Sequence, residues 1–252
     1  MRALGLTHRP SPGTLAEAIQ VLDVDPPRPR RREVLVRVFA STINIDDLHV
    51  AEGSFYGGIP IGPRPSCARP VIPGSDLAGI VTEVGDNVRS FRVGQAVFGV
   101  QMPFHRRGAW EEYCAVDERW LTSKPHDLSF ETAAASGISG LVALYAVRAL
   151  NPRPGARIVV VGATGGIGSM AVQLTSQAGA EVIGVCGSTN IQRAYELGCS
   201  LVVDYKKEAW DCALLNRTKT QIDGVLDFVG GRQVEEAGRR VLRRDGIFVT
   251  VV

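Results

Sequence analysis

Several features that commonly reveal a protein's class are missing from this sequence. Its five cysteines include no Cys-x-x-Cys pair, and their irregular spacing predicts neither a disulfide framework nor a zinc knuckle. Reduced thiols in a cytoplasmic protein are the simplest interpretation. The N-terminus lacks the apolar core of a signal peptide, and the longest apolar stretch, residues 133–147, is too short and too interrupted to span a bilayer. We therefore expect no contact with a membrane.

The chain also lacks a strong excess of charge of either sign. Its 252 residues carry a formal net charge of +2, which is too small to indicate a nucleic-acid partner. The one basic run, residues 28–32, is interpreted as a short loop before a strand, because it has no aromatic side chains nearby to stack on bases. The composition, 45% hydrophobic and 21% charged, suits one large globular domain or two modest ones.

What the sequence does contain changes in character near residue 128. Before that point, short segments with strand character are separated by many glycines and prolines, which predicts a small barrel or sandwich-like domain over residues 1–128. The expected strands are residues 33–39, 77–84, 95–100 and 111–116.

From residue 129 onward, helical and strand-like segments alternate. Helices are expected from residue 129 or 131 to residue 150 and at residues 167–178, 190–197 and 233–242, and strands at residues 157–161, 181–185, 201–203, 224–228 and 247–252. This alternation predicts a doubly wound parallel sheet over residues 129–252, so the fold class of the chain is α/β.

A glycine-rich loop connects the first strand of that half to the helix after it. In such a loop one glycine allows a tight turn, another lets the backbone approach a pyrophosphate, and a third lets the helix pack closely on the strand. The helix N-terminus then offers unpaired N–H groups to the phosphates. Because a strand precedes the loop and a βαβ unit continues it, we predict a dinucleotide site at Gly162, Ala163, Thr164, Gly165, Gly166, Ile167 and Gly168.

The end of the next strand indicates which dinucleotide binds. NAD sites usually place an Asp or Glu there, where it holds the ribose hydroxyls, but residues 185–190 contain no acid. Ser188, Thr189 and Arg193 could instead donate hydrogen bonds to a 2′-phosphate. We therefore predict NADPH as the cofactor, with a solvated Arg193 as the alternative interpretation of that side chain.

Other segments, in their order and spacing, identify a family. Together with the nucleotide loop, residues 33–38, 44–47, 73–81, 83–88, 93–99, 108–113, 196–199, 202–205 and 225–231 resemble the medium-chain dehydrogenase/reductase superfamily, in its zinc-free quinone oxidoreductase and enoyl reductase branch. The resemblance implies a GroES-like, partly open barrel joined to a Rossmann domain, with the active site in the cleft between them. It also implies that Tyr205 lies near the 2′-phosphate, and that Val229, Gly230 and the strand near Val251 lie near the nicotinamide.

Zinc-dependent relatives bind their catalytic metal through a cysteine, a His-Glu pair and a further Cys or Asp. Here Asn44 stands at the first position and Ser75 and Asp76 at the second, and the third region, residues 135–139, has no cysteine. His49, His105 and His126 form no metal-binding spacing. We therefore predict no zinc, and a substrate whose conjugation delocalises the incoming charge, namely a quinone or an α,β-unsaturated carbonyl compound.

Asn44 is the predicted catalytic residue, because it matches an asparagine of the zinc-free branch. Its amide could orient the nicotinamide or the substrate carbonyl. The alternative is a purely structural role, in which the asparagine only forms a turn. The proton donor stays open. Ile45 replaces a tyrosine assigned as donor in some enoyl reductases, Asp47 is more plausibly structural, and Tyr56 and solvent remain candidates.

Two features depart from the family pattern. Val142 replaces a threonine that relatives commonly carry beside the cofactor, and the chain stops in the fifth strand of the nucleotide domain, which should then be an exposed edge. The predicted function is an NADPH-dependent, zinc-independent reductase of a small quinone or enone, with a homodimer as a further possibility. The alternatives are a non-catalytic dinucleotide-binding protein and, third, a zinc-dependent alcohol dehydrogenase.

Overall fold

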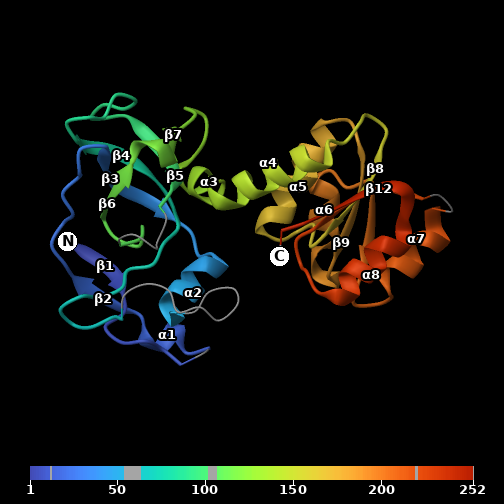
Figure 1. Cartoon of the computed structure of the whole chain (residues 1–252), viewed down its shortest axis with the longest axis horizontal. Coiled ribbons are helices and arrows are strands. Elements are labelled where there is room, and N and C mark those ends of the chain that lie inside the picture. The colour runs from blue at the N-terminus through green and yellow to red at the C-terminus, as the bar shows by residue number, and fades with distance from the viewer. Residues whose placement is uncertain (12, 54–63, 102–106, 219–220, 252) are drawn as a thin grey trace. The chain divides into compact units, whose positions relative to one another are not determined.

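The computed structural model describes residues 1–251 apart from residues 12, 54–63, 102–106 and 219–220 (Figure 1). The chain forms two compact units, Met1–Ile138 and Ser139–Val252. The division falls later than the change of character near residue 128, because helix α3 (Phe130–Ala135) packs on strands of the first unit.

The first unit is built on an antiparallel sheet. Its strand order is β6 (Tyr113–Asp117), β3 (Glu33–Ser41), β4 (Asp76–Val84), β5 (Ala96–Val100) and β7 (Leu121–Ser123). β1 (Arg2–Gly5) and β2 (Gln20–Asp23) form a separate antiparallel pair, and the helical segments are α1 (Leu15–Ala18), α2 (Ile45–Glu52), α3 and η1 (Glu118–Trp120). The four predicted strands are confirmed to within a few residues.

Alternation within the strands places the core of this unit on one face of the sheet. In β3, Val34 and Val36 are fully buried, while the side chains between and beside them are more exposed. Buried residues of the neighbouring strands, including Leu77, Val97 and Val116, complete the cluster. The opposite face is partly covered, because Ala78 of β4 packs with Ala133 and Ala134 of α3.

The second unit is a parallel sheet, as the alternating pattern predicts. Its strand order is β10 (Leu201–Asp204), β9 (Glu181–Cys186), β8 (Arg157–Val161), β11 (Ile222–Asp227) and β12 (Leu242–Thr250), with every neighbouring pair parallel. Within the described part of the chain β12 is an edge strand, and it begins at Leu242, earlier than the expected residue 247.

Helices cover both faces of this sheet (Figure 1). α4 (Ile138–Leu150), α5 (Gly166–Gln177) and α6 (Ile191–Leu197) pack on the face that contains Ile158 and Val160. α7 (Trp210–Thr218) and α8 (Arg232–Val241) pack on the face that contains Val159 and Val161. Because both faces are covered, β8 is a continuous apolar run instead of an alternating one.

One expected helix is wrong, since residues 129–150 do not form a single helix. α3 ends before Ser136 and α4 begins at Ile138, with Gly137 at the break. A Cβ on Gly137 would lie 2.1 Å from Asp76 Oδ1, and that oxygen accepts a hydrogen bond of 2.7 Å from the backbone N–H of Ile138. A long-range contact to Asp76, which periodicity does not reveal, therefore accompanies the break in the helix.

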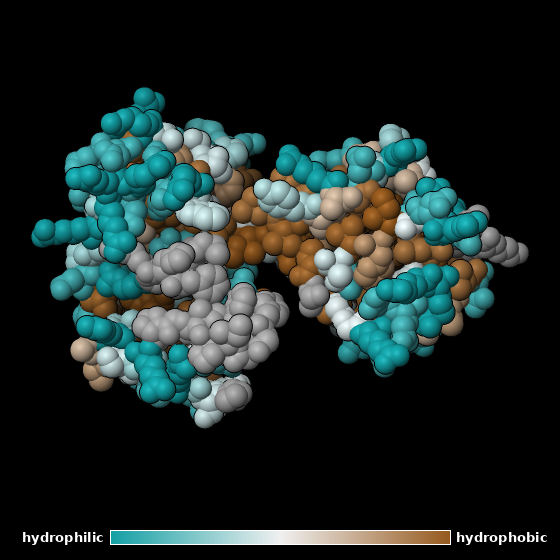
Figure 2. Space-filling model, in the orientation of Figure 1, coloured by the Kyte–Doolittle hydropathy of each residue, from teal (hydrophilic) through white to brown (hydrophobic). Residues whose placement is uncertain are grey.

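α4 is the most apolar helix of the second unit, and Figure 2 shows hydrophobic residues along it. Its exposed side chains include Leu141 and Tyr145. None of the helices in the described ranges, α4 among them, has the length and apolar character needed to cross a membrane.

Candidate functional site

The nucleotide loop has the backbone geometry that its glycines predict. Gly162 follows β8 with φ of 78°, a left-handed conformation that favours glycine. A Cβ on Gly168 would lie 2.0 Å from the carbonyl oxygen of Gly162, so only glycine allows the first turn of α5 to pack this closely on the loop. The tight turn and the close approach thus belong to two different glycines.

The start of α5 is open to an anion. The helix begins after Gly165, which supplies no side-chain cap, and both Gly165 and Gly166 are exposed. The N–H groups of Gly162 and Ala163 are already used, because both donate to the carbonyl of Val185. The first-turn amides of α5, at Gly166, Ile167 and Gly168, are therefore the groups that could bind a pyrophosphate.

The end of β9 contradicts one part of the cofactor argument. The turn has no acid in its own sequence, yet Asp204 at the end of β10 brings a carboxylate to it, and Ser188 Oγ donates to Asp204 Oδ2 at 2.6 Å. The Ser188 hydroxyl proton is therefore not free for a phosphate. The hydrogen bond from Ser188 lowers the pKa of Asp204, so this carboxylate is ionised at neutral pH. This carboxylate was not predicted from the sequence, because Asp204 lies on the neighbouring strand.

Basic and polar groups surround that carboxylate. The Asp204 carboxylate also accepts from the backbone N–H of Lys206 at 3.0 Å and lies 4.0 Å from Lys207 Nζ. Tyr205 is exposed, its ring would be 3.7 Å from a Cβ on Gly187, and Lys206 Nζ is 5.8 Å from the ring centroid. The two lysines were missed by the sequence argument, although they directly follow Tyr205.

The other predicted contacts at this end of the sheet are exposed. Thr189 lies in η2 (Ser188–Asn190), which carries no side-chain cap at its start. Arg193 on α6 is 3.6 Å from Glu196 in a solvent-exposed ion pair. Such a pair is weak, so Arg193 can exchange its partner for a phosphate at little cost.

The loop after β11 lies against the nucleotide loop. Asp227 Oδ1 accepts from the backbone N–H groups of Val229 and Gly230, at 2.9 and 3.0 Å. This fixes the turn so that Val229 Cγ2 would be 3.0 Å from a Cβ on Gly162. Because β8 and β11 are neighbours but not consecutive strands, their carboxyl ends flank the point where strand order reverses, where ligands of open α/β sheets bind.

In the first unit, Asn44 lies in a network around Asp76. Its Nδ2 donates to Thr42 Oγ1 at 2.9 Å and to Asp76 Oδ2 at 2.8 Å. Thr42 Oγ1 donates to the same carboxylate oxygen at 2.8 Å, and Ser41 Oγ donates to the backbone carbonyl of Asp76 at 2.6 Å. Asn44 also begins α2, so it is both a helix-capping residue and part of a buried polar cluster.

Asp47 is buried and holds the neighbouring backbone. Its carboxylate accepts from Ser75 Oγ at 2.7 Å and from the N–H groups of Gly74 and Asn44 at 3.0 and 2.8 Å. Burial raises the pKa of Asp47 and, likewise, that of Asp76, although these hydrogen bonds oppose the shift. Asn44, Ser75 and Asp76 stand where the resemblance implies zinc ligands in zinc-dependent relatives; Asn44 bonds directly to Asp76, and Asp47 joins Asn44 to Ser75.

The described residues offer no metal site, and two of their buried thiols are not activated as nucleophiles. Within those ranges no three His, Cys, Asp or Glu side chains are grouped so that they could hold a metal ion. Burial raises the pKa of the Cys199 thiol to about 12 and also raises that of Cys186, so both thiols are protonated at neutral pH. Tyr56 and His105 lie outside the described residues. Ile45 is more than half exposed.

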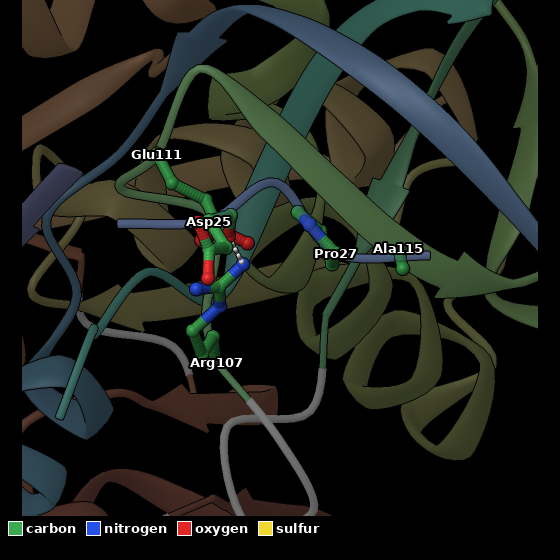
Figure 3. Close-up of a pocket in the computed structure, with 5 residues that line it drawn as sticks. All are labelled: Asp25, Pro27, Arg107, Glu111 and Ala115. Carbon is green, nitrogen blue, oxygen red and sulfur yellow. Dashed lines mark hydrogen bonds and ion pairs between the residues drawn. The ribbon is translucent and has the colours of Figure 1, made fainter. Parts of the chain in front are cut away.

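A pocket of about 370 Å³ lies elsewhere in the first unit (Figure 3). Figure 3 shows the Arg107 side chain pointing toward Asp25 and Glu111; its guanidinium donates to the Asp25 carbonyl at 2.9 Å and lies 3.0 Å from Glu111 Oε2. None of the residues that line it belongs to the predicted site, and two of its charged side chains, Arg107 and Glu111, are paired with each other. We do not assign the cofactor or the substrate to it.

Two family models match the chain, one in each half. Residues 30–126 match the alcohol dehydrogenase GroES-like domain, and residues 166–251 match the zinc-binding dehydrogenase model. A quinone oxidoreductase of Salmonella typhimurium is 31% identical over 241 residues, which cover 93% of this chain and 68% of the relative. The chloroplast envelope quinone oxidoreductase homolog of Arabidopsis thaliana is 32% identical over 86% of this chain.

A solved structure is similar to this chain across both of the regions that the family models match. The Escherichia coli quinone oxidoreductase complexed with NADPH superposes with a TM-score of 0.83 at 27% identity, covering 99% of this chain and 72% of that one. The chain spans 65% of the length of the Arabidopsis relative, so an activity of the longer relatives does not carry over to it without a test.

Proposed function

This chain belongs to the medium-chain dehydrogenase/reductase superfamily, in its quinone oxidoreductase branch, and we propose that it is a zinc-independent reductase that uses NADPH. Its proposed substrate is a quinone or an α,β-unsaturated carbonyl compound. The observation that carries the proposal is the turn at Gly162, closed on Gly168 and followed by the uncapped start of α5. That backbone fits a dinucleotide pyrophosphate.

NADPH is proposed over NADH because positive charge gathers around the end of β10. Lys206 is exposed beside the ring of Tyr205, and Arg193 is exposed on α6. Asp204 weakens this argument, yet its charge is offset by Ser188, by the Lys206 amide and by Lys207. A 2′-phosphate would therefore meet more donors than repelling groups.

When bound, NADPH would supply the hydride, and the protein's own residues would position the reactants. The first turn of α5 would hold the pyrophosphate, and the Asp227-anchored turn would present Val229 to the nicotinamide side. Asn44 would orient a reacting partner by hydrogen bonding. Since Ile45 has no proton to give, the proton would come from Tyr56 or from solvent.

The test is oxidation of NADPH with 1,2-naphthoquinone or a simple enone. We expect turnover that requires the acceptor and persists after treatment with a chelator. Titration with NADPH and NADH separates the cofactor claim from the activity claim: NADPH should bind at least about tenfold more tightly, because a 2′-phosphate gains charge-assisted hydrogen bonds. Equal affinities for NADPH and NADH would contradict the proposed 2′-phosphate site at the end of β10.

A non-catalytic dinucleotide-binding protein is the second candidate, and Ile45 favours it. Saturable NADPH binding without turnover of any quinone or enone would support this candidate and reject the reductase. Stoichiometric zinc in the purified protein, lost together with activity on chelation, would instead favour an alcohol dehydrogenase.

A further inference from the structure

The hydrogen-bond network around Asn44 determines which of its atoms a ligand can meet. A side-chain amide has two N–H donors and one carbonyl acceptor. Both donors of Asn44 are used inside the protein, by Asp76 Oδ2 and Thr42 Oγ1. The carboxylate of Asp76 can only accept, so it fixes the nitrogen of Asn44 on its own side.

The remaining polar atom of the Asn44 side chain is its carbonyl oxygen. Asn44 is half-buried at the start of α2 and forms a capping box with Asp47, whose N–H also donates to the backbone carbonyl of Asn44 at 3.1 Å. A carbonyl oxygen has two lone pairs, so it can accept a second hydrogen bond from a ligand. It cannot donate one.

Asp76 is itself held in place from several directions. It is 1% exposed, its Oδ1 accepts from the N–H of Ile138, and its backbone carbonyl accepts from Ser41. Gly137 lies so close to Oδ1 that a Cβ there would clash. The hydrogen bonds from Ile138, Thr42 and Asn44 therefore hold the carboxylate in its orientation toward Asn44.

We propose that Asp76 is a positioning residue that makes Asn44 a hydrogen-bond acceptor, so that the ligand group at Asn44 is a neutral N–H or O–H donor and not a carbonyl oxygen. The proposal rests on the proposed reductase function. Two reaction partners offer such a donor: the carboxamide of the nicotinamide, and the hydroxyl of a hydroquinone product.

The orientation of Asn44 can be tested in the wild-type protein by NMR. We expect the side-chain amide protons of Asn44 to exchange with solvent at least about tenfold more slowly than those of the exposed Asn87, because both are bonded inside the protein. Exchange as fast as at Asn87 would overturn the assignment, and this measurement needs neither a variant nor activity.

The consequence can be tested by binding. NADP⁺ is compared with its 3-acetylpyridine analogue, which lacks the carboxamide N–H, and a hydroquinone is compared with its dimethyl ether. Wild-type protein should bind the donor-bearing member of one pair about tenfold more tightly. A preference for NADP⁺ over its analogue would identify the nicotinamide carboxamide as the donor. A preference for the hydroquinone over its ether would identify the hydroxyl of the product. Equal affinities within both pairs would contradict the proposal.

Two variants separate positioning from a merely structural role. Asp76→Asn offers an N–H to Asn44, so the amide should turn over and the preference for the donor should disappear. Combining it with Asn44→Asp exchanges donor and acceptor while keeping the same net charge, and the preference should return. If Asp76→Asn folds and keeps the wild-type preference, Asp76 is only structural. If NADP⁺ does not bind to the wild type at all, the proposed function itself fails.

Discussion

The two units of this protein prepare their candidate sites in different ways. In the parallel unit the site is mostly backbone: a left-handed Gly162, a Gly168 without room for a Cβ, and the amides that begin α5. In the antiparallel unit it is a network of side chains, in which Asp47 and Asp76 hold Asn44 and its neighbours.

This difference determines what each site tolerates. The backbone geometry of the loop requires glycines, which have no Cβ, so adding one methyl group is enough to disturb it. A buried side-chain network depends on every partner being present, because each donor that loses its acceptor remains unpaired away from water. The four predictions that follow disturb one unit at a time, beginning with the largest expected effect.

Asp47→Ala should cause the largest loss of stability. It leaves Ser75 Oγ and the N–H groups of Gly74 and Asn44 without their acceptor, which we expect to lower the free energy of unfolding by about 3–5 kcal/mol. Chemical denaturation measures it. The matched control is Asp46→Ala on the same helix, with an expected loss below about 1 kcal/mol. Similar losses in both variants would mean that the network contributes little.

Gly168→Ala should damage the parallel unit by overpacking. The added Cβ meets the backbone of Gly162 at 2.0 Å, and we expect a loss of about 1–3 kcal/mol in stability together with weaker NADPH binding. Gly155→Ala is the control away from the loop: Gly155 has a left-handed φ of 78° and open space around it, so this substitution strains the backbone without overpacking. If Gly168→Ala binds NADPH as well as the control does, the loop is not the cofactor site.

The pH dependence of stability should have opposite signs in the two units. The pKa of Asp47 is raised from 3.8 by burial, so its contribution to stability is complete below pH 3.8 and is lost as pH rises through its pKa in the folded protein. The pKa of Asp204 is lowered from 3.8 by Ser188, so its contribution is present above pH 3.8 and is lost as pH falls through its folded pKa.

Melting temperatures of the wild type, Asp47→Asn and Asp204→Asn from about pH 3 to about pH 7 would measure this. The advantage of the wild type over Asp47→Asn should shrink as pH rises, and its advantage over Asp204→Asn should shrink as pH falls. If the melting temperatures of all three proteins changed in parallel with pH, the pKa shifts assigned to Asp47 and Asp204 would both be contradicted.

Lys206→Ala should have the smallest effect, and only on the cofactor. Lys206 is exposed, so its charge is screened by solvent; we expect NADPH affinity to fall about threefold while NADH affinity is unchanged. Calorimetric titration of both cofactors measures the difference, and the effect should weaken as salt increases. An equal loss for NADH would indicate a structural role for Lys206 instead.

The sequence predicts the parallel unit better than the antiparallel one, for a physical reason. Apolar runs, glycines and strand order follow from neighbours in the chain, so β8, the loop and α5 are predicted nearly to the residue. The pairing of Asp76 with Asn44, and its contact with Ile138 at the break between α3 and α4, join distant residues. No local pattern reveals them.

Asp204 illustrates the same limit within the parallel unit. Inspection of the turn after β9 finds no acid, but parallel pairing aligns Asp204 of β10 with Cys186 of β9 and brings the carboxylate to Ser188. The register of two neighbouring strands, and not the turn itself, determines the charge at this position. The elements missed altogether are mostly short and carry no periodic signal; they are β1, β2, β7, α1, α2, α7, η1 and η2.

The most direct test of the proposed reductase follows the hydride itself. The protein is incubated with an α,β-unsaturated ketone and NADPH that carries deuterium at the transferable position of the nicotinamide ring, and the saturated product is examined by mass spectrometry. The account predicts one deuterium on the carbon β to the carbonyl, formed by the wild type and much more slowly by Gly168→Ala. Saturable NADPH binding with no deuterated product from any quinone or enone acceptor would contradict it.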